Sequence, residues 1–273
     1  MLVIEQNYFP AIGYFGTAAL SCAQVSRTAP ISSKGGPVAF SNSNRLLEVL
    51  PSETRSELLL HLEPVELPLH TVLFEAETAP QYVHFITSGI ASTVTILSAG
   101  EGVEVVFVGS EGIAEKIHLL GPLTGMTRCF MQVAGTGLRM DFKRCEEMFA
   151  KDANLRSAIL RLVQHEALVL AQLAACNRVH EVEERLARWL LMVQDRTGEA
   201  EMRLTQEFLA YMLGARRSTV NLAAGSLQRS GLIEYRRSRI RIENREQLVE
   251  VACECYPIIR KLLNNVFQDL NPR

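Results

Sequence analysis

The stretch EFLAYMLGARRSTVNLAAGSLQRSGLIEY, residues 207–235, predicts two helices joined by a tight turn. With Gln206 counted as the first position, Ala210, Gly214 and Val220 stand fifth, ninth and fifteenth. A small alanine lets two helices approach, a glycine permits the backbone of a tight turn, and a valine packs the second helix onto the first. This spacing predicts a helix-turn-helix.

Flanking residues support the same register. Thr205 is a suitable N-cap for the first helix, and Glu207 is favourable in its first turn. Four leucines are expected to complete the core of the unit: Leu209, Leu213, Leu227 and Leu232.

The second helix is expected to begin near Arg216 and to present its leading face to the major groove of DNA. Arginine pairs bidentately with guanine, which favours Arg217 as a base reader, and Arg216 is expected to meet a phosphate. A solvated helix end is the alternative explanation for the two arginines. Cations are unfavourable at a helix N-terminus, so binding of an external anion explains Arg216 and Arg217 better. The predicted DNA contacts are Thr205, Gln206, Arg216, Arg217, Ser218, Thr219, Asn221, Arg237 and Arg239.

Positive charge is concentrated in this part of the chain. The whole chain of 273 residues has a net charge of −2, whereas residues 203–245 contain nine arginines and three acids. Within them LIEYRRSRIRI, residues 232–242, alternates apolar and polar residues around a polar turn, which predicts a two-stranded wing. Spacing, charge and wing together favour double-stranded DNA as a partner.

Upstream, residues 67–142 form short apolar or alternating runs separated by turn residues, which predicts a β-sandwich or barrel. Residues 154–194 contain no proline or glycine and predict one long helix. Its apolar stripe predicts the seam of a homodimer, interrupted at Glu166; an internal core helix is the alternative. The stripe consists of Leu155, Ile159, Leu162, Val169, Leu173 and Cys176.

In the order of these pieces the chain resembles bacterial transcription regulators of the Crp/Fnr family, named for the cyclic-AMP receptor protein and the fumarate-nitrate reduction regulator. The resemblance rests on LPSETRSELLLHLEPVEL, FITSG, ERLARWLL, LTQEFLAYMLGARRSTV, SLQRSGLIEY and ACECY. It implies an α+β fold: a cyclic-nucleotide-binding-like β-barrel (jelly roll), a long dimerisation helix and a C-terminal winged helix-turn-helix. It also implies a homodimer on a two-fold-symmetric DNA site, with RNA polymerase as a partner if the protein activates.

The domain boundaries expected from these patterns divide the chain into five parts. They are a poorly ordered extension (1–43), a sensor domain (44–150), a dimerisation helix (151–194), a winged helix-turn-helix (195–256) and a C-terminal tail (257–273). Three residues depart from the family pattern. Arg216 stands where the family commonly has serine, Leu222 matches a basic base reader, and Phe208 matches a glutamate.

The sensor part lacks the family's cyclic-nucleotide signature. Ala114-Glu115 stands in place of a Gly-Glu pair, and Thr127-Arg128 reverses and displaces the Arg-Ser or Arg-Thr pair that neutralises the phosphate. A buried phosphate without its arginine would lose its strongest contacts. Glu115, Thr127 and Arg128 are therefore candidate effector residues, and the effector is expected to be another small molecule, or none. A cyclic-nucleotide-responsive regulator is the alternative.

The cysteines and the missing motifs exclude other classes. Six scattered cysteines favour free thiols in the cytoplasm, and Cys253 and Cys255 are predicted to be thiols on a terminal helix, without metal. No cofactor is expected, because the N-terminal extension holds only Cys22 and an iron-sulfur cluster normally needs four thiolates. No apolar run reaches membrane-spanning length, and no enzyme signature occurs. A ligand-binding module whose helix-turn-helix contacts protein remains the other alternative.

Overall fold

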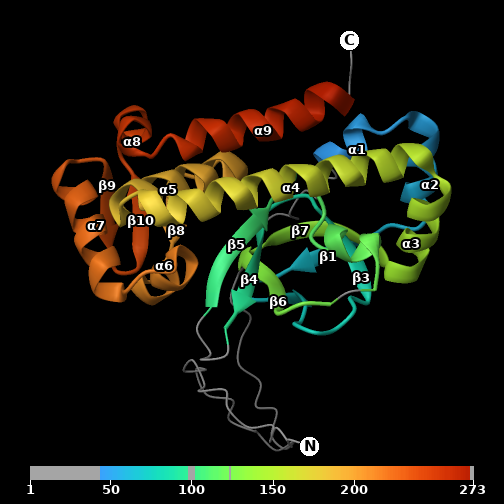
Figure 1. Cartoon of the computed structure of the whole chain (residues 1–273), viewed down its shortest axis with the longest axis horizontal. Coiled ribbons are helices and arrows are strands. Elements are labelled where there is room, and N and C mark those ends of the chain that lie inside the picture. Colours follow the sequence, from blue (N-terminus) through green and yellow to red (C-terminus); the bar gives the residue numbers. More distant parts are fainter. Residues whose placement is uncertain (1–43, 98–101, 123, 271–273) are drawn as a thin grey trace, which may run out of the picture.

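The computed structural model describes residues 44–97, 102–122 and 124–270, so the predicted extension 1–43 lies outside the described residues. A β-barrel and a helix-rich unit lie side by side under two long helices, α4 (Ala153–Val179) and α9 (Cys255–Leu270) (Figure 1). The predicted α+β architecture of barrel, long helix and winged helix-turn-helix is confirmed.

Two short helices, α1 (Arg45–Val49) and α2 (Ser52–Leu59), precede the barrel. Asn44 caps α1 by accepting a hydrogen bond from the Leu47 amide at 3.3 Å. Its side-chain amide also donates to the carbonyls of Ile86 at 2.7 Å and Gly112 at 2.9 Å. One buried asparagine thus starts the helix and attaches it to the barrel.

The barrel consists of two antiparallel sheets, with strand orders β1-β7-β3 and β2-β6-β4-β5. A cluster that includes Leu67, Ile86 and Met131 fills the space between strands. The strands are β1 (Glu63–Leu67), β2 (Val72–Phe74), β3 (Tyr82–Ile86), β4 (Ile90–Ile96), β5 (Gly102–Val108), β6 (Thr127–Val133) and β7 (Gly135–Asp141), with a short 3-10 helix, η1 (Lys116–Leu120), between β5 and β6.

The helical segment after α3 (Phe142–Lys151) is broken once, so the prediction of a single helix through residue 194 is wrong. α4 ends at His180, whose backbone is extended, and α5 (Val182–Thr197) begins directly after Glu181. Glu181 and Glu184 form a capping box, in which the Glu184 carboxylate accepts from the Glu181 amide at 2.9 Å. A capping box satisfies two amides of a new helix, so it favours a start at this point.

The stripe predicted as a dimer seam is buried within the chain instead. Leu155, Ile159 and Leu162 pack in a cluster with the barrel and α1, whereas Val169 and Cys176 belong to the core shared with α5. The interrupting Glu166 forms an ion pair with Lys116 of η1. The internal-core interpretation is therefore correct for this face of α4.

The C-terminal unit contains α6 (Gln206–Leu213), α7 (Arg217–Arg229) and α8 (Arg245–Val251) against a small sheet. The sheet has three strands in the order β8-β10-β9, namely β8 (Glu201–Arg203), β9 (Ile233–Arg236) and β10 (Arg239–Ile242). The third strand, β8, adds an edge to the predicted two-stranded wing.

Where a tail was predicted for residues 257–273, α9 runs back along α4 to the barrel (Figure 1). Val266 and Phe267 are buried in the same cluster as α1, and the Arg45 guanidinium lies 3.9 Å from the centre of the Phe267 ring. The described part of α9 is thus anchored on α1 beside the barrel, and the tail prediction is wrong for these described residues.

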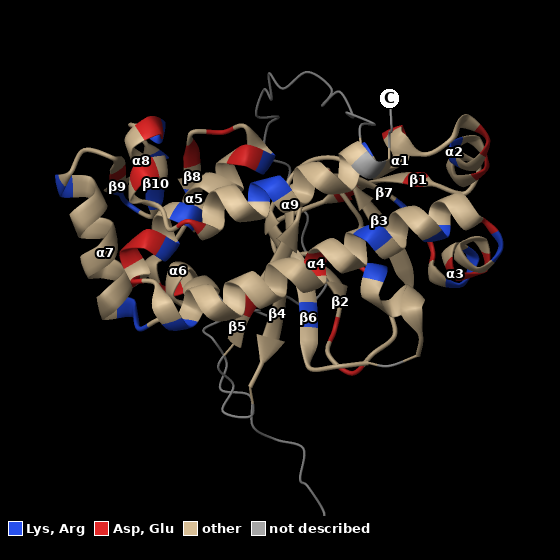
Figure 2. Cartoon of the chain, turned by 45° about the horizontal axis from the view of Figure 1, so that its top comes forward, with Lys and Arg blue, Asp and Glu red and all other residues tan. Residues whose placement is uncertain are grey.

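α4 is long and apolar enough to cross a membrane by length and composition alone, with few charged residues along it (Figure 2). A single helix of this kind is weak evidence for a span, since core helices of soluble proteins pass the same criterion. Its buried residues pack against the barrel, α5 and α9, as expected of a helix at the centre of a folded domain.

Candidate nucleic-acid interface

The turn between α6 and α7 has the local chemistry that the sequence predicts. Thr205 caps α6 by accepting from the Phe208 amide at 3.1 Å. Gly214 ends α6 at φ 57°, a left-handed conformation that glycine adopts readily. Arg216 is the N-cap of α7 and makes no side-chain capping bond, and Val220 is completely buried. The second helix is therefore held from one side and open on the other.

The open side of α7 carries all five residues predicted at its start. Arg216, Arg217, Ser218, Thr219 and Asn221 are exposed. The structure brings them together on one helix end, where backbone amides and side-chain donors are available to an anion.

A polar network links this helix end to α6. Gln206 donates to the Asn221 side-chain oxygen at 2.5 Å, and Arg217 Nη1 lies 2.6 Å from Glu207 Oε1. Both members of this ion pair are mostly exposed, so the pair contributes at most about 1 kcal/mol and yields readily to a stronger anion. Sequence spacing alone did not identify Glu207 as the partner of Arg217.

The wing turn places two adjacent residues in left-handed backbone, Arg237 at φ 50° and Ser238 at φ 59°. Two positive φ angles match the two-residue turns that join twisted hairpins. Arg239 on β10 forms a 3.0 Å ion pair with Glu201 of β8, so the added strand positions one of the predicted DNA contacts.

Two departures from the family pattern differ in what they expose. Leu222 is 72% exposed on α7, so an apolar side chain lies on the presented face. Phe208 is partly buried and packs against the core of the unit. The glutamate that the family pattern has at the position of Phe208 is therefore replaced by an apolar residue that packs against the helix pair.

Helix α5, which packs against the helix-turn-helix, is attached to the barrel through polar side chains. Trp189 of α5 donates from Nε1 to Glu104 Oε1 at 2.7 Å, and Ser92 of β4 donates to Glu104 Oε2 at 2.6 Å. Burial raises the pKa of Glu104 to about 7, although these hydrogen bonds and Arg188 act in the opposite direction. A second pair, Arg196 Nε to Glu111 Oε1 at 2.6 Å, joins α5 to the loop after β5.

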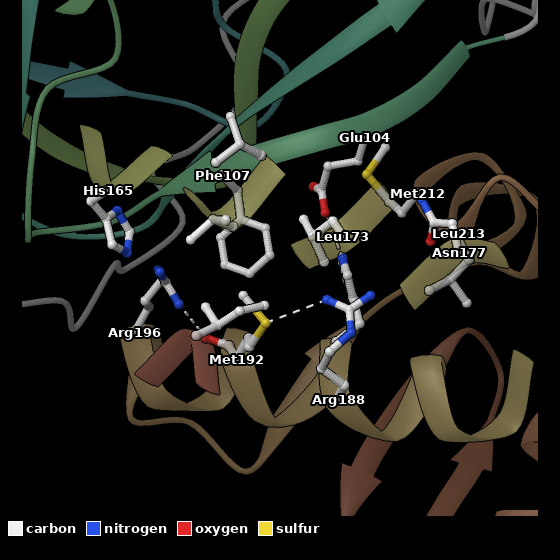
Figure 3. A pocket seen from close by; sticks show the side chains of 14 residues that line it. Glu104, Phe107, His165, Leu173, Asn177, Arg188, Met192, Arg196, Met212 and Leu213 are labelled. Carbon is white, nitrogen blue, oxygen red and sulfur yellow. Dashed lines mark hydrogen bonds between the residues drawn. The ribbon is translucent and has the colours of Figure 1, made fainter. Parts of the chain in front are cut away.

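This junction also lowers the basicity of a histidine. Burial, followed by the charge of Arg196, lowers the pKa of His165 to about 4, so His165 is neutral at physiological pH. The cavity beside it, between β5, α4, α5 and α6, has a volume of about 30 Å³ (Figure 3). Such a space holds one or two water molecules and is too small for a nucleotide.

The helix-turn-helix itself rests on the barrel at β5. A Cβ added to Gly214 would lie 2.7 Å from Val103 Cγ2, and one added to Gly102 would lie 2.1 Å from the Tyr211 hydroxyl oxygen. Strand β5 therefore touches both α6 and the turn that leads into α7.

The three candidate effector residues do not form a phosphate clamp. Glu115 is fully buried and accepts from the His84 amide at 2.8 Å and bonds His84 Nδ1 at 2.6 Å. Arg128 Nε lies 3.2 Å from Glu75 Oε2, and Thr127 begins β6 opposite Thr95. A larger hollow of about 540 Å³, which includes Tyr82, His118 and Lys143, is lined by none of the three candidates.

Folding brings the close cysteine pair beside two further residues that could bind a metal. Cys253 lies between α8 and α9, Cys255 begins α9, and the end of α4 places Cys176 and His180 beside them. Their potential ligand atoms all lie within 4.8 Å of one another. Sequence patterns do not reveal this set, because its two halves are 73 or more residues apart.

Comparisons with known proteins agree with this architecture. Residues 184–251 match the family model of the Crp-like helix-turn-helix domain. The chain is 24% identical over 196 residues to the fumarate and nitrate reduction regulatory protein of Escherichia coli K12, covering 66% of this chain and 74% of that protein. The corresponding protein of Yersinia pestis is 25% identical over the same length and coverage.

Solved structures show the same fold. The c-di-GMP-responsive global regulator of Xanthomonas campestris superimposes with a TM-score of 0.60 at 17% identity, covering 70% of this chain and 99% of that chain. A Crp/Fnr-family transcriptional regulator from Eubacterium rectale gives a TM-score of 0.62 at 14% identity, with coverages of 76% and 96%. The chain therefore contains a Crp-like helix-turn-helix domain, and it is similar in sequence and in fold to transcription regulators of the Crp/Fnr family.

Proposed function

We propose that this regulator is a homodimer that binds a specific two-fold-symmetric DNA site with the N-terminal half of α7. The observation that carries the proposal is the division of α7 into two faces. Val220, Ala223, Ala224 and Leu227 are buried against the unit, whereas residues 216–219 and 221 are exposed. A helix held from behind with a polar leading end is what major-groove reading requires.

Roles follow from side-chain chemistry. Arg217 is assigned to a base edge, because its guanidinium can pair bidentately with guanine once Glu207 releases it. Arg216 lies at the N-cap and is assigned to a phosphate. The remaining assigned phosphate and backbone contacts are Thr205, Gln206, Ser218, Thr219, Asn221, Arg237 and Arg239.

The proposed dimer interface is the face of α4 opposite the buried stripe. Leu160 is 44% exposed, and the residues that follow it at alternating steps of four and three form an exposed line. This line consists of Leu160, Gln164, Ala167, Ala171, Ala174 and Arg178. A heptad-like line of mostly apolar and small residues suits close packing of two identical helices. Two such subunits present their α7 helices to half-sites about 34 Å apart.

In this proposal residues 44–150 sense, residues 151–194 connect and dimerise, and residues 195–256 read DNA, in the cytoplasm. The sensor acts through β5, which contacts α6, and through Glu104 and Glu111, which hold α5. The effector is a small molecule other than cyclic AMP, because Glu115 is engaged with His84 and Arg128 with Glu75. If the protein activates transcription, RNA polymerase is its partner.

Binding to duplex DNA at increasing salt tests the proposal. Three arginines per subunit, Arg216, Arg237 and Arg239, give six phosphate contacts per dimer. The logarithm of the binding constant should then fall with the logarithm of salt concentration with a slope of about −5. Fluorescence anisotropy with random DNA and with a site selected from a random pool measures the slope. A flat salt profile would show that the helix-turn-helix contacts protein instead.

A further inference from the structure

The junction of α4 with the C-terminal segment gathers four metal-ligating side chains. Cys176 and His180 lie one turn apart at the end of α4, and Cys253 and Cys255 lie where the chain passes from α8 into α9. All three cysteines are buried, and the histidine is partly buried. Residues distant in sequence thus converge on one point outside the DNA-reading face.

Two of the separations between the four ligand atoms match a single tetrahedral ion, and all of these atoms lie within 4.8 Å of one another. Cys176 Sγ lies 3.6 Å from Cys253 Sγ, and Cys255 Sγ lies 3.7 Å from His180 Nδ1. Ligands about 2.3 Å (sulfur) and about 2.0 Å (nitrogen) from a tetrahedral zinc ion are separated by roughly 3.5–3.8 Å. The separation is far longer than the roughly 2.05 Å of a disulfide bond. Ligand atoms this close together surround a single metal ion, whereas an iron-sulfur cluster needs space for several irons and their bridging sulfides.

The surroundings supply the contacts that a thiolate site needs. Gln172 Nε2 lies 3.1 Å from Cys255 Sγ and donates to it, and Glu254 Oε1 lies 4.0 Å from His180 Nε2, the nitrogen that faces away from the cysteines. A carboxylate behind a ligating histidine orients the ring and strengthens the ligand.

Charge balance favours the same assignment. Zn²⁺ with three thiolates and a neutral imidazole carries a net charge of −1. Arg185 and Arg188 of α5 are both buried, and their charges act on Cys176 or Cys253. The Nε atoms of both arginines have no hydrogen-bond partner among the described residues. A buried anionic centre beside them compensates two cations that are otherwise costly to bury.

We propose that Cys176, His180, Cys253 and Cys255 bind one Zn²⁺ ion per chain as a closed structural site. Four protein ligands leave no open coordination position, so the ion holds the chain together and does not catalyse. His180 is also the C-cap of α4, directly before Glu181, the N-cap of α5. The ion therefore fixes the C-terminal segment to the break between the sensor-bound helix and the reading unit.

Metal analysis of the full-length protein tests this directly. Protein purified under reducing conditions and dialysed against metal-free buffer should retain about one zinc per chain by mass spectrometry. Cys176→Ala and Cys253→Ala should each lower the zinc content at least tenfold. Cys145→Ala is the matched control, because Cys145 is a buried cysteine on α3 that does not belong to the proposed site. This variant should retain the full zinc content.

A measurement on the unaltered chain covers the case in which the variants fail to fold. Zinc is removed with a thiol-blocking mercurial that is later reversed by excess thiol, and Co²⁺ is then titrated in. One equivalent should produce the visible bands of tetrahedral cobalt with thiolate ligands, and Zn²⁺ should abolish them. The proposal is overturned by zinc below about one-tenth equivalent after loading, by iron with inorganic sulfide, or by a Cys176–Cys253 disulfide in the anaerobically purified protein.

Discussion

The indole of Trp189 donates a 2.7 Å hydrogen bond to the carboxylate of Glu104, and this bond joins α5, which packs against the helix-turn-helix, to strand β5 of the barrel. The other oxygen of the same carboxylate accepts from Ser92 of the neighbouring strand. One side chain from the barrel is therefore shared by both parts of the protein. Its protonation state affects how firmly they are held together.

Replacing Glu104 by glutamine should remove a pH dependence of stability. Burial raises the pKa of Glu104 from 4.5 to about 7. Because the folded pKa lies above the unfolded value, the contribution of this group to stability is complete below about pH 4.5 and is lost as the pH rises through about 7. Solvent reaches part of the residue, so we expect a loss of about 1–2 kcal/mol in the wild type between pH 5 and 8 that Glu104→Gln lacks.

Urea unfolding of both proteins across this pH range measures the difference. Glu57→Gln is the control, because Glu57 lies on α2 with its side chain about half exposed. Parallel pH profiles for the wild type and Glu104→Gln would contradict a raised pKa at this junction.

The contact of the turn with the barrel gives a second prediction. Gly214→Ala should destabilise the protein for two reasons: the residue stands at φ 57°, and the new Cβ would lie 2.7 Å from Val103 Cγ2. The left-handed backbone costs about 1–2 kcal/mol for an alanine, and the contact adds to this cost.

The two causes are separated by repeating the substitution in Val103→Ala, which removes the methyl carbon that the Cβ would meet. The free energy lost on Gly214→Ala should be smaller in that background, leaving the backbone cost alone. Equal losses in both backgrounds would mean that α6 does not rest on β5 in solution.

Much of the fold could be predicted because the decisive signals are local. The helix-turn-helix depends on Ala210, Gly214 and Val220, which lie within eleven residues of one another, and the wing on a two-residue turn. The end of α4 at His180 is harder to predict, since a capping box of Glu181 and Glu184 within a run free of glycine and proline resembles ordinary helix surface.

Other features depend on tertiary contacts between segments that are far apart in the sequence. The periodicity of Leu155, Ile159 and Leu162 shows that one face of α4 is buried, but the same pattern suits a partner subunit and the chain's own barrel equally. The C-terminal helix does carry a usable signal, because apolar residues recur at steps of three and four from Ile259 to Phe267. The cysteine–histidine set has none, since only folding brings its halves together.

Arg217→Ala should relax sequence preference in DNA binding. The loss of a bidentate contact should cost about 1–3 kcal/mol on the selected site and little on random DNA. Arg229→Ala is the matched control, because it removes the same exposed charge from the opposite end of α7. An equal loss on both kinds of DNA, measured by anisotropy at one salt concentration, would assign Arg217 to a phosphate.

Cyclic AMP should leave the affinity for DNA unchanged. The carboxylate of Glu115 is buried against His84, and Arg128 forms an ion pair with Glu75, so neither is placed to receive a ribose hydroxyl or a cyclic phosphate. Anisotropy with and without the nucleotide measures the affinity, and calorimetry measures binding itself. A heat signal at micromolar cyclic AMP that disappears in Arg128→Ala would restore Arg128 as the phosphate partner.

Ala171→Glu should separate the proposed dimer into monomers. Ala171 is exposed near the middle of the line on α4 that begins at Leu160, and in a paired helix its copy would bring two carboxylates together in an apolar seam. Ala150→Glu, at an exposed position near the end of α3, is the control that adds the same charge away from α4. Sedimentation equilibrium should give the mass of two chains for the wild type and the control, and one chain for Ala171→Glu. Each half-site then binds one subunit alone, so the variant should also lose most of its affinity for a two-fold site while keeping its affinity for a half-site. An unchanged mass for Ala171→Glu would show that the dimer interface lies on another face.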